Sequence, residues 1–292
     1  MSRLKHIKPY QIFEASAPAL TAEQIEWLDE CSVGRWKLNR QTGLIDVDGD
    51  FDCNEQGLTD FKGVEFGKVS GNFYCEHNQL TTLEGAPQKV GDIFYCHKNQ
   101  LTTLVGAPQT VGRNFYCEHN QLTSLEGAPK TVGGDFYCAN NQLTTLEGAP
   151  QSINGWFSCD NNGLTTLEGA PKTVGGDFDC YNNELTTLEG APKTVGGYFN
   201  CSQNQLTSLV GAPQSVGRNF DCRDNPISSG TLKGIFALMR KGMGYQQALE
   251  ERWPKMKDVD RVLMYKDHPS LTPEDARKYK ALATYGNIKN YL

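Results

Sequence analysis

Side chains that could bind a metal or transfer protons occur in three consecutive repeats of the sequence. Glu76 and His77 follow one cysteine, His97 follows the next, and Glu118 and His119 follow the third. Imidazole and carboxylate groups serve as metal ligands and as general acids or bases. No Ser or Cys stands outward beside them in a nucleophile arrangement. A metal-dependent hydrolase using the region of His77, His97 and His119 is one hypothesis, and solvated surface histidines are the simpler interpretation.

Alternating aspartates in the segment IDVDGDFDC raise the possibility of calcium binding. Asp46, Asp48 and Asp50 occupy every second position there. A calcium loop needs a glycine after its third aspartate and a glutamate at its twelfth position, but this sequence has Phe51 and Gly57. A strand with apolar side chains inward and aspartates outward explains the alternation better.

Cysteine supplies a third kind of reactive group, because the chain has ten. Neighbours in register on parallel strands lie about 4.8 Å apart, whereas a disulfide needs Cβ atoms about 3.8 Å apart. We therefore interpret the repeated cysteines as a ladder of small buried apolar groups and expect no metal there. The inward cysteines are Cys53, Cys75, Cys96, Cys117, Cys138, Cys159, Cys180, Cys201 and Cys222.

Free thiols in such number are typical of a reducing compartment. The opening residues MSRLKHIKPY contain no apolar signal region, and no stretch is long enough to span a membrane. We expect a cytoplasmic protein without a cofactor, because no phosphate loop or other cofactor motif occurs.

The reactive residues are positioned by a 21-residue repeat that restarts at a phenylalanine. The full copies begin at Phe73, Phe94, Phe115, Phe136, Phe157, Phe178 and Phe199, with a variant at Phe51 and a short copy at Phe220. A period of this length predicts a solenoid, in which each repeat buries its apolar face only against its neighbours. Phe and Cys, two positions apart, point the same way in a strand and must face inward.

The repeat core F-x-C-x-x-N-x-L-T-x-L resembles the leucine-rich repeat, with Phe and Cys at two of the leucine positions. The resemblance implies a right-handed coil with a parallel β-sheet. Its asparagine should bond backbone groups where the chain leaves the strand. The second half, E-G-A-P-x-x-V-G-G, contains too much Gly and Pro for a helix and predicts a turn with an extended segment. The ladder asparagines are Asn78, Asn99, Asn120, Asn141, Asn162, Asn183, Asn204 and Asn225, with Gln56 in the first turn.

The flanking segments predict caps for the two ends of the coil. Residues 1–44 form an N-terminal cap, in which Thr21 and Gln24 make a capping box and a hairpin follows. Residues 45–225 form the solenoid of nine turns, and residues 226–292 form a C-terminal helical cap. The helices expected in this last cap cover 231–241, 245–253, 259–266 and a final segment that starts at Thr272.

Charge is divided unevenly among these regions. Residues 45–225 carry 10 Lys and Arg against 22 Asp and Glu. An acidic array is a poor surface for nucleic acid, because phosphate contacts need Lys and Arg. The C-terminal 67 residues are net basic, which is more often a solvated surface than a patch for nucleic acid or an acidic partner.

The positions around Phe and Cys that face outward vary from repeat to repeat, while the inward positions stay constant. Tyrosine and tryptophan there often carry interface energy. The alternative is that the tyrosines only stabilise the sheet by stacking on one another. The expected binding face consists of Tyr74, Tyr95, Tyr116, Tyr137, Trp156, Tyr181 and Tyr198, with Glu76, Glu118, Asp135, Asp177 and Asp179 around them.

The repeat block, the front-end motifs W-K-L-N and D-V-D-G-D-F-D-C and the helical tail resemble leucine-rich repeat proteins of large tailed bacteriophages and some bacteria. The resemblance implies a protein-binding scaffold acting in the bacterial cytoplasm. The implied partner is a host or defence protein, or a phage protein. It supplies no catalytic residue, and we expect no enzyme. A homo-oligomeric structural protein is a further hypothesis, and the sequence leaves the oligomeric state open.

Overall fold

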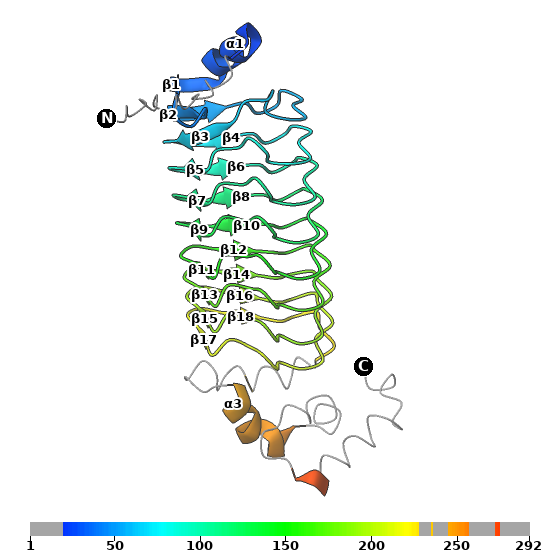
Figure 1. The fold of residues 1–292 in the computed structure, drawn as a ribbon. Coiled ribbons are helices and arrows are strands. Elements are labelled where there is room, and N and C mark those ends of the chain that lie inside the picture. The colour runs from blue at the N-terminus through cyan, green and yellow to red at the C-terminus, as the bar shows by residue number, and fades with distance from the viewer. Residues whose placement is uncertain (1–19, 228–234, 236–244, 257–271, 275–292) are drawn as a thin grey trace, which may run out of the picture.

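The computed structural model describes residues 20–227, 235, 245–256 and 272–274, and the repeats wind as one stacked coil (Figure 1). Each 21-residue turn contributes two short strands, and equivalent strands of neighbouring turns pair in parallel. Helices are few among the described residues. The predicted parallel β-solenoid is therefore confirmed.

The strands that contain the repeated phenylalanines form one continuous ladder, which we call the front ladder. Its members pair residue for residue at the 21-residue spacing, as Phe73 does with Phe94. Their bounds are β2 (Ile45–Asp52), β4 (Phe73–Tyr74), β6 (Phe94–Tyr95), β8 (Phe115–Tyr116), β10 (Phe136–Tyr137), β12 (Phe157–Ser158), β14 (Phe178–Asp179), β16 (Phe199–Asn200) and β18 (Phe220–Asp221).

The extended segment after each E-G-A-P turn forms a second ladder, the back ladder. The sequence predicts an extended conformation there, and the pairing of these segments is what the structure adds. The first group is β3 (Phe66–Val69), β5 (Lys89–Val90), β7 (Thr110–Val111) and β9 (Thr131–Val132). A separate group is β11 (Ser152–Ile153), β13 (Thr173–Val174), β15 (Thr194–Val195) and β17 (Ser215–Val216).

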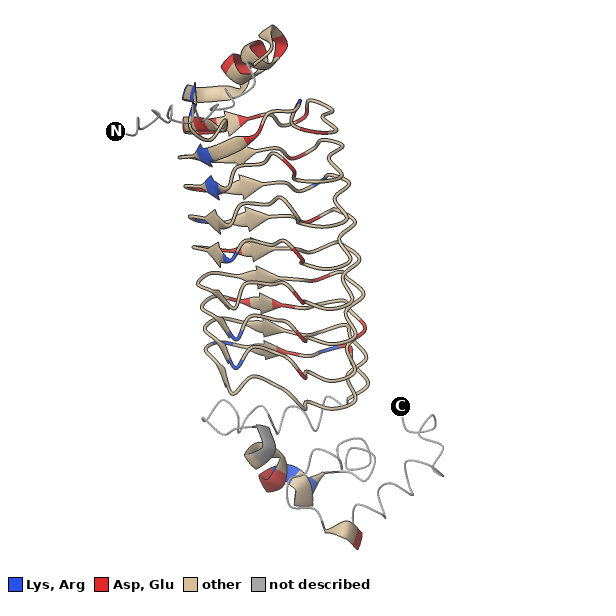
Figure 2. Cartoon of the chain, viewed as in Figure 1, with Lys and Arg blue, Asp and Glu red and all other residues tan. Residues whose placement is uncertain are grey.

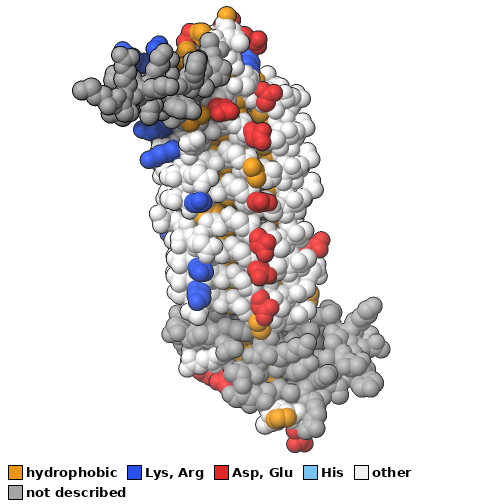
Figure 3. Space-filling view, viewed as in Figure 1, with side chains coloured by type: hydrophobic (Ala, Val, Ile, Leu, Met, Phe, Trp, Pro, Cys, Tyr) orange, Lys and Arg blue, Asp and Glu red, His pale blue; other side chains and the backbone are white. Residues whose placement is uncertain are grey.

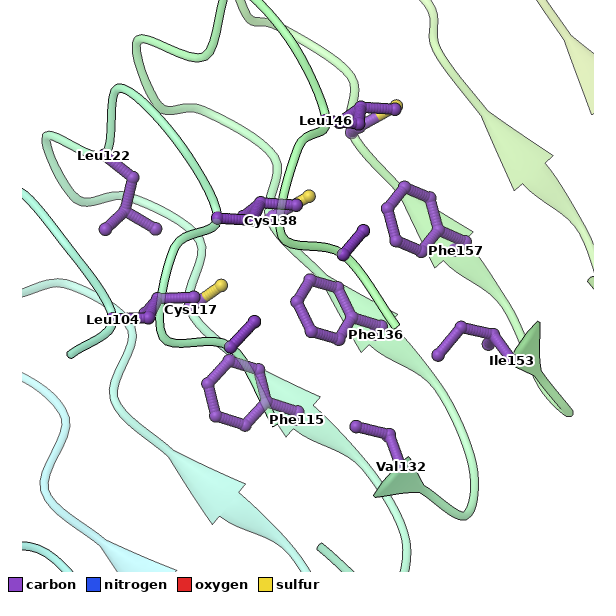
Figure 4. Packing of buried hydrophobic residues seen from close by; sticks show 14 of the residues in the cluster. Leu104, Phe115, Cys117, Leu122, Val132, Phe136, Cys138, Leu146, Ile153 and Phe157 are labelled. Atoms are coloured by element: carbon purple, nitrogen blue, oxygen red, sulfur yellow. The ribbon is translucent and has the colours of Figure 1, made fainter. Parts of the chain in front are cut away.

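The core lies between the two ladders and repeats in every turn (Figure 4). Phe94 stacks on Phe73 and on Phe115 with ring centroids 5.5 Å apart on each side, and all three side chains are fully buried. Leucines from the L-T-x-L segment and the valine of the back ladder fill the remaining space, as Leu104 and Val132 illustrate. Aromatic stacking of this kind adds about 0.5–1.5 kcal/mol per pair beyond the burial of area.

Asparagine and cysteine side chains tie each turn to its neighbours. Asn99 donates from Nδ2 to Cys75 O (3.0 Å) and Cys96 O (3.2 Å), and its Oδ1 accepts from Leu80 N (3.0 Å). The thiol of Cys75 donates to Tyr95 O in the next turn (3.1 Å). All ten cysteines are free and buried, and burial raises the pKa of the Cys75 thiol well above its usual value. The predicted asparagine ladder is thus present, and the thiols stay neutral.

The N-terminal cap joins the first turn through α1 (Ala22–Cys31) and a hairpin of β1 (Ser32–Leu38) with β2. The predicted capping box is present, because Thr21 and Gln24 exchange side chain-to-backbone hydrogen bonds. Gln56 accepts from Trp27 Nε1 (2.8 Å) and donates to Cys31 Sγ (3.2 Å). At the place of a ladder asparagine, Gln56 therefore fastens α1 to the coil.

The alternating aspartates of β2 bond the next turn of the chain. Ile45, Val47 and Phe51, which alternate with them, are buried, as strand alternation predicts. Each aspartate accepts a hydrogen bond from the following turn, which gives the acidic run a structural role. The bonds are Asp46 Oδ1 with Lys68 N (3.1 Å), Asp48 Oδ1 with Ser70 Oγ (3.2 Å) and Asp50 Oδ1 with Asn72 N (2.7 Å).

Beyond the coil, the described residues include α3 (Tyr245–Arg252) and the 3-10 turn η1 (Trp253–Lys255). The helix predicted over 245–253 agrees with this segment, and Ala248 and Leu249 are fully buried. The helices expected over 259–266 and after residue 274 lie outside the described residues, as does nearly all of the one over 231–241.

Candidate functional site: the outer face of the front ladder

Four tyrosines stack in a single column on the outer face of the front ladder. The ring centroids of Tyr74, Tyr95, Tyr116 and Tyr137 are separated in turn by 5.0, 4.8 and 4.8 Å, with interplanar angles of 9°, 5° and 4°. Because the ring faces lie against one another, each side chain is only partly exposed. The stacking contacts that the structural interpretation of the tyrosines requires are present, and each side chain keeps part of its surface exposed.

The hydroxyl ends of this column join a polar network. Asn114 Nδ2 donates to Tyr116 Oη (3.1 Å) and to Asp135 Oδ2 (3.2 Å), and Tyr137 Oη donates to the same carboxylate (3.4 Å). Burial, followed by the charge of Asp135, raises the pKa of Tyr137. The phenol of Tyr137 therefore stays protonated and acts as a hydrogen-bond donor.

The column immediately before each phenylalanine divides into residues that hold the next turn and residues that face solvent. Asp135 and Asp177 accept from the backbone N–H groups of Trp156 and Tyr198, each at 2.8 Å. Trp156 and Tyr198 are 51% and 42% exposed, and Arg218 lies 5.5 Å from the ring centroid of Tyr198. Asp135 and Asp177 thus have a structural role that the sequence interpretation missed. The recurrence of Asn or Asp before Phe was its signal.

The tyrosine column ends at Tyr137, and shorter side chains continue the same positions. Asp179 Oδ1 accepts from Tyr181 N (2.9 Å), and Asn200 Oδ1 accepts from Ser202 N (3.1 Å). Burial, partly offset by the hydrogen bond from Tyr181 N, raises the pKa of Asp179. In this half of the face, local side chain-to-backbone bonds replace ring stacking.

Three polar atoms without hydrogen-bond partners lie in the column that follows the cysteines. They are Glu76 Oε2, His97 Nδ1 and Glu118 Oε2, one in each of three successive turns beside the tyrosines. Burial raises the pKa of Glu76 and raises that of Glu118 to about 7. Burial, with weaker repulsion from His77 and Lys98, lowers the pKa of His97 to about 4. His97 is therefore neutral at pH 7, and the row has unused hydrogen-bonding capacity.

The other two histidines of the predicted cluster occupy a different position in the repeat. His77 and His119 sit at the left-handed turn before the ladder asparagine, with φ of 54° and 55°, and both are exposed. The ring centroids of His77 and His97 are 5.5 Å apart and meet edge to face. The described residues contain no group of three or more His, Cys, Asp or Glu side chains able to hold a metal ion.

The opposite side of the coil carries a regular acidic column that the sequence interpretation treated only as a turn. Figure 2 shows the acidic residues recurring along the coil, and Figure 3 shows a column of acidic side chains beside a row of basic ones. The exposed glutamates at this repeat position are Glu84, Glu126, Glu147, Glu168 and Glu189. They supply matched controls for the glutamates of the front face.

The 21-residue turn, the inward leucines and the bonded asparagine ladder define a solenoid of the leucine-rich repeat type. Solved structures similar to this chain include YopM from Yersinia enterocolitica WA-314, at 17% identity and a TM-score of 0.38, covering 71% of this chain and 51% of that one. YopM from Yersinia pestis, described as a leucine-rich effector protein, matches at 16% identity and a TM-score of 0.38, covering 70% and 76%. The matched region thus spans about half of the first YopM chain. No protein-family model and no curated protein matches the chain.

Helices are too short or too polar throughout the described part of the chain for any of them to cross a bilayer.

Proposed function

We propose that the protein is a binding scaffold that engages another protein through the outer face of its front ladder. The observation that carries this proposal is the row of Glu76 Oε2, His97 Nδ1 and Glu118 Oε2, buried without partners beside a tyrosine stack. A buried polar atom without a partner costs about 1–3 kcal/mol. Rotation of these side chains would expose the three atoms, and a partner that supplies the missing bonds would then recover this cost.

The chemistry of the face indicates a partner with hydrogen-bond donors and positive charge. The described ion pairs join Lys62 to Glu23, Arg113 to Asp92 and Arg223 to Asp221, so the carboxylates of the proposed site are not neutralised by a cation. A lysine or arginine brought to Glu76 or Glu118 would lower the pKa of that carboxyl and form a charge-assisted bond. The exposed parts of the tyrosines and of Trp156 would supply apolar contact.

The resemblance of the repeats to those of tailed bacteriophages favours a setting in the bacterial cytoplasm. The partner in that setting is a host or defence protein, or a component of the phage itself. The ten free buried cysteines are consistent with a reducing compartment. We propose no catalytic role for the histidines.

An affinity capture from bacterial lysate tests the proposal with two matched double variants. Glu76→Met/Glu118→Met removes the two front-face carboxyl groups whose Oε2 atoms lack partners, at nearly constant volume. Glu147→Met/Glu168→Met makes the same change on the opposite side of the coil. We expect wild type and the second variant to retain a common protein, which the first variant loses.

The captured protein should then bind the purified chain with an association rate that falls as salt is raised, because the face is acidic. Retention of the partner by both variants would move the site to the turns or to a cap. Capture of nucleic acid that persists at high salt would contradict a protein-binding role. Stoichiometric zinc, manganese or calcium in the purified protein would favour the hydrolase hypothesis instead.

A further inference from the structure

The first strand of the chain has an open edge. In the part of the chain that the structure describes, β1 pairs only with β2, whereas the front-ladder strands from β4 to β16 have a paired neighbour on both sides. Figure 1 shows β1 at the end of the stack, beyond β2. One edge of a strand of seven residues is therefore left without a neighbouring strand there.

Strand alternation identifies the backbone groups along this edge. Asn39 N donates to Leu44 O at the turn of the hairpin (2.8 Å), so the β1 residues that bond β2 are the alternate ones beginning with Lys37. Gly34 and Trp36 stand between those residues, and their N–H and C=O groups point away from β2. Within the described ranges, these groups of Gly34 and Trp36 have no backbone partner.

The side chains of β1 divide between an inward face and a basic outward face. On the inward face, Trp36 Nε1 donates to Asp29 Oδ1 of α1 (2.7 Å). On the outward face, Arg35 and Lys37 are exposed, and 64% of Val33 is exposed. The open edge thus lies beside two accessible cations.

These two cations form no ion pair with a described residue. Asp48 and Asp46 stand directly opposite Arg35 and Lys37 in the register of the hairpin. Both carboxylates instead accept hydrogen bonds from the next turn of the coil, and the described ion pairs include neither cation. The pairing of β1 with β2 therefore shows that β1 accepts an extended strand with acidic side chains at alternate positions, and it leaves both positive charges available.

We infer that the open edge of β1 is a second docking site, and that it takes an extended peptide segment with acidic side chains at alternate positions. Such a segment adds a strand to the sheet by bonding the backbone groups of Gly34 and Trp36. Its acidic side chains then stand opposite Arg35 and Lys37, on the side that β2 leaves open. The site lies on the N-terminal cap, so it is independent of the tyrosine face.

Charge disfavours two other occupants of this edge. A second copy that paired its own β1 antiparallel over the whole strand would place the two Arg35 side chains directly opposite each other, and like charges in that position are destabilising. Residues 1–19 of the chain contain a single acidic residue, Glu14, so they cannot supply a carboxylate to both cations. The segment that fits the edge is therefore expected in another protein.

Fluorescence anisotropy with two labelled heptapeptides, TDVDVDT and its amide counterpart TNVNVNT, tests the docking on the full chain. We expect TDVDVDT to bind, and Arg35→Gln/Lys37→Gln to weaken that binding at least about fivefold, because two charge pairs are lost. The same variant should change the affinity for TNVNVNT less than about twofold, since that peptide has no charge to pair. Lys172→Gln/Lys193→Gln removes two exposed cations beside the back ladder and should bind TDVDVDT like wild type.

Backbone methylation of the acidic peptide separates strand addition from simple charge attraction. With the aspartates opposite Arg35 and Lys37, the valine N–H groups of TDVDVDT face β1, so methylation of both valine nitrogens should abolish binding. The aspartate N–H groups face solvent, and methylation of two of them should leave binding in place.

Three results would overturn the proposal. The first is failure of TDVDVDT to bind the full chain, as when residues 1–19 or a second copy already occupy the edge. The second is equal binding by the two methylated peptides, which would reduce the effect to charge attraction. The third is equal affinity of wild type and Arg35→Gln/Lys37→Gln for TDVDVDT, with circular dichroism confirming that the variant is folded.

Discussion

The two halves of the front face share the same backbone conformation but differ in their outward side chains. From Tyr74 to Tyr137 the central column is a stack of aromatic rings, with an unpartnered polar row beside it. From Asp179 to Asp221 the same column consists of short side chains that bond a backbone N–H two residues later. The inner column of phenylalanines stays stacked through both halves. The core therefore does not dictate the outer face, and the first half bears an energetic cost that the second half avoids.

The largest expected change in the free energy of unfolding comes from deleting a ring in the middle of the tyrosine stack. Tyr116→Ala removes two stacking contacts and part of a buried ring, so we expect a loss of about 2–3 kcal/mol in the free energy of unfolding. Tyr116→Phe keeps the stack, loses one bond to Asn114, and should cost under about 1 kcal/mol. Urea denaturation of both variants measures this. Equal costs would show that the hydroxyl network, and not the stack, stabilises the first half.

Replacing a carboxyl group that has one unpartnered oxygen should instead raise the free energy of unfolding. Glu118→Met removes a buried oxygen without a partner and should stabilise the chain by about 1–2 kcal/mol at pH 8. The pKa of Glu118 is raised to about 7 in the folded chain, from 4.5. Its contribution to stability is therefore full below pH 4.5 and is lost as the pH rises to 7. The gain from Glu118→Met should shrink toward pH 5.

The pH dependence of stability also separates the contribution of Glu118 from that of His97. His97, with a pKa lowered to about 4, contributes stability above pH 6.5 that is lost as the pH falls toward 4. This loss is shared by wild type and Glu118→Met, so the difference between them isolates the carboxyl. A difference that stays constant from pH 5 to 8 would contradict the raised pKa of Glu118.

A single substitution can move the boundary between the two halves of the front face. Ser158 is the register partner of Tyr137 in the neighbouring strand, so Ser158→Tyr should extend the stack by one ring. We expect a gain of about 0.5–1.5 kcal/mol in unfolding free energy, the value of one aromatic pair. Thermal unfolding followed by near-ultraviolet circular dichroism measures it. No gain would mean that the turn at Ser158 does not present its side chain as the turn at Tyr137 does.

Trp156 should have the smallest effect on stability. Its side chain is 51% exposed, and its backbone N–H keeps its bond to Asp135 after substitution. We expect Trp156→Ala to change the free energy of unfolding by less than about 0.5 kcal/mol. If Trp156 contributes to a protein interface, the same variant should weaken capture of the partner. Retained capture would remove it from the proposed site.

The sequence predicts the fold well because every 21-residue repeat contains all the residue types that make the core contacts. Phe, Cys, Asn and Leu recur at fixed spacing, and stacking the copies leaves one arrangement for them. The column assignments of the outer face followed from strand alternation, including the stack of four tyrosines. The sequence interpretation placed Asp135 and Asp177 on the binding face, although the recurrence of Asn or Asp before Phe was a signal that they hold the next turn.

The histidine cluster shows the other limit of sequence reasoning. His97 follows its cysteine directly, whereas His77 and His119 stand one position later, and that shift moves them into a left-handed turn. The gap in the back ladder between β9 and β11, in the turn where Asn154 takes the place of the usual glycine, was likewise not visible in the sequence. The structural effect of a single residue difference between repeats can be predicted here only when the contact at that position is known.

The constant register of the coil has a consequence for how such a gene can change. The stretch LEGAPKTVGGDF occurs at 125–136 and again, unaltered, at 167–178. Unequal recombination between the two copies would delete residues 137–178, two complete turns, and join Phe136 to Asp179 without disturbing any core position. The deletion would remove the turn containing Asn154 and Trp156 in one step. Tandem identity thus lets recombination reshape the outer surface in units of whole turns while the inner columns remain intact.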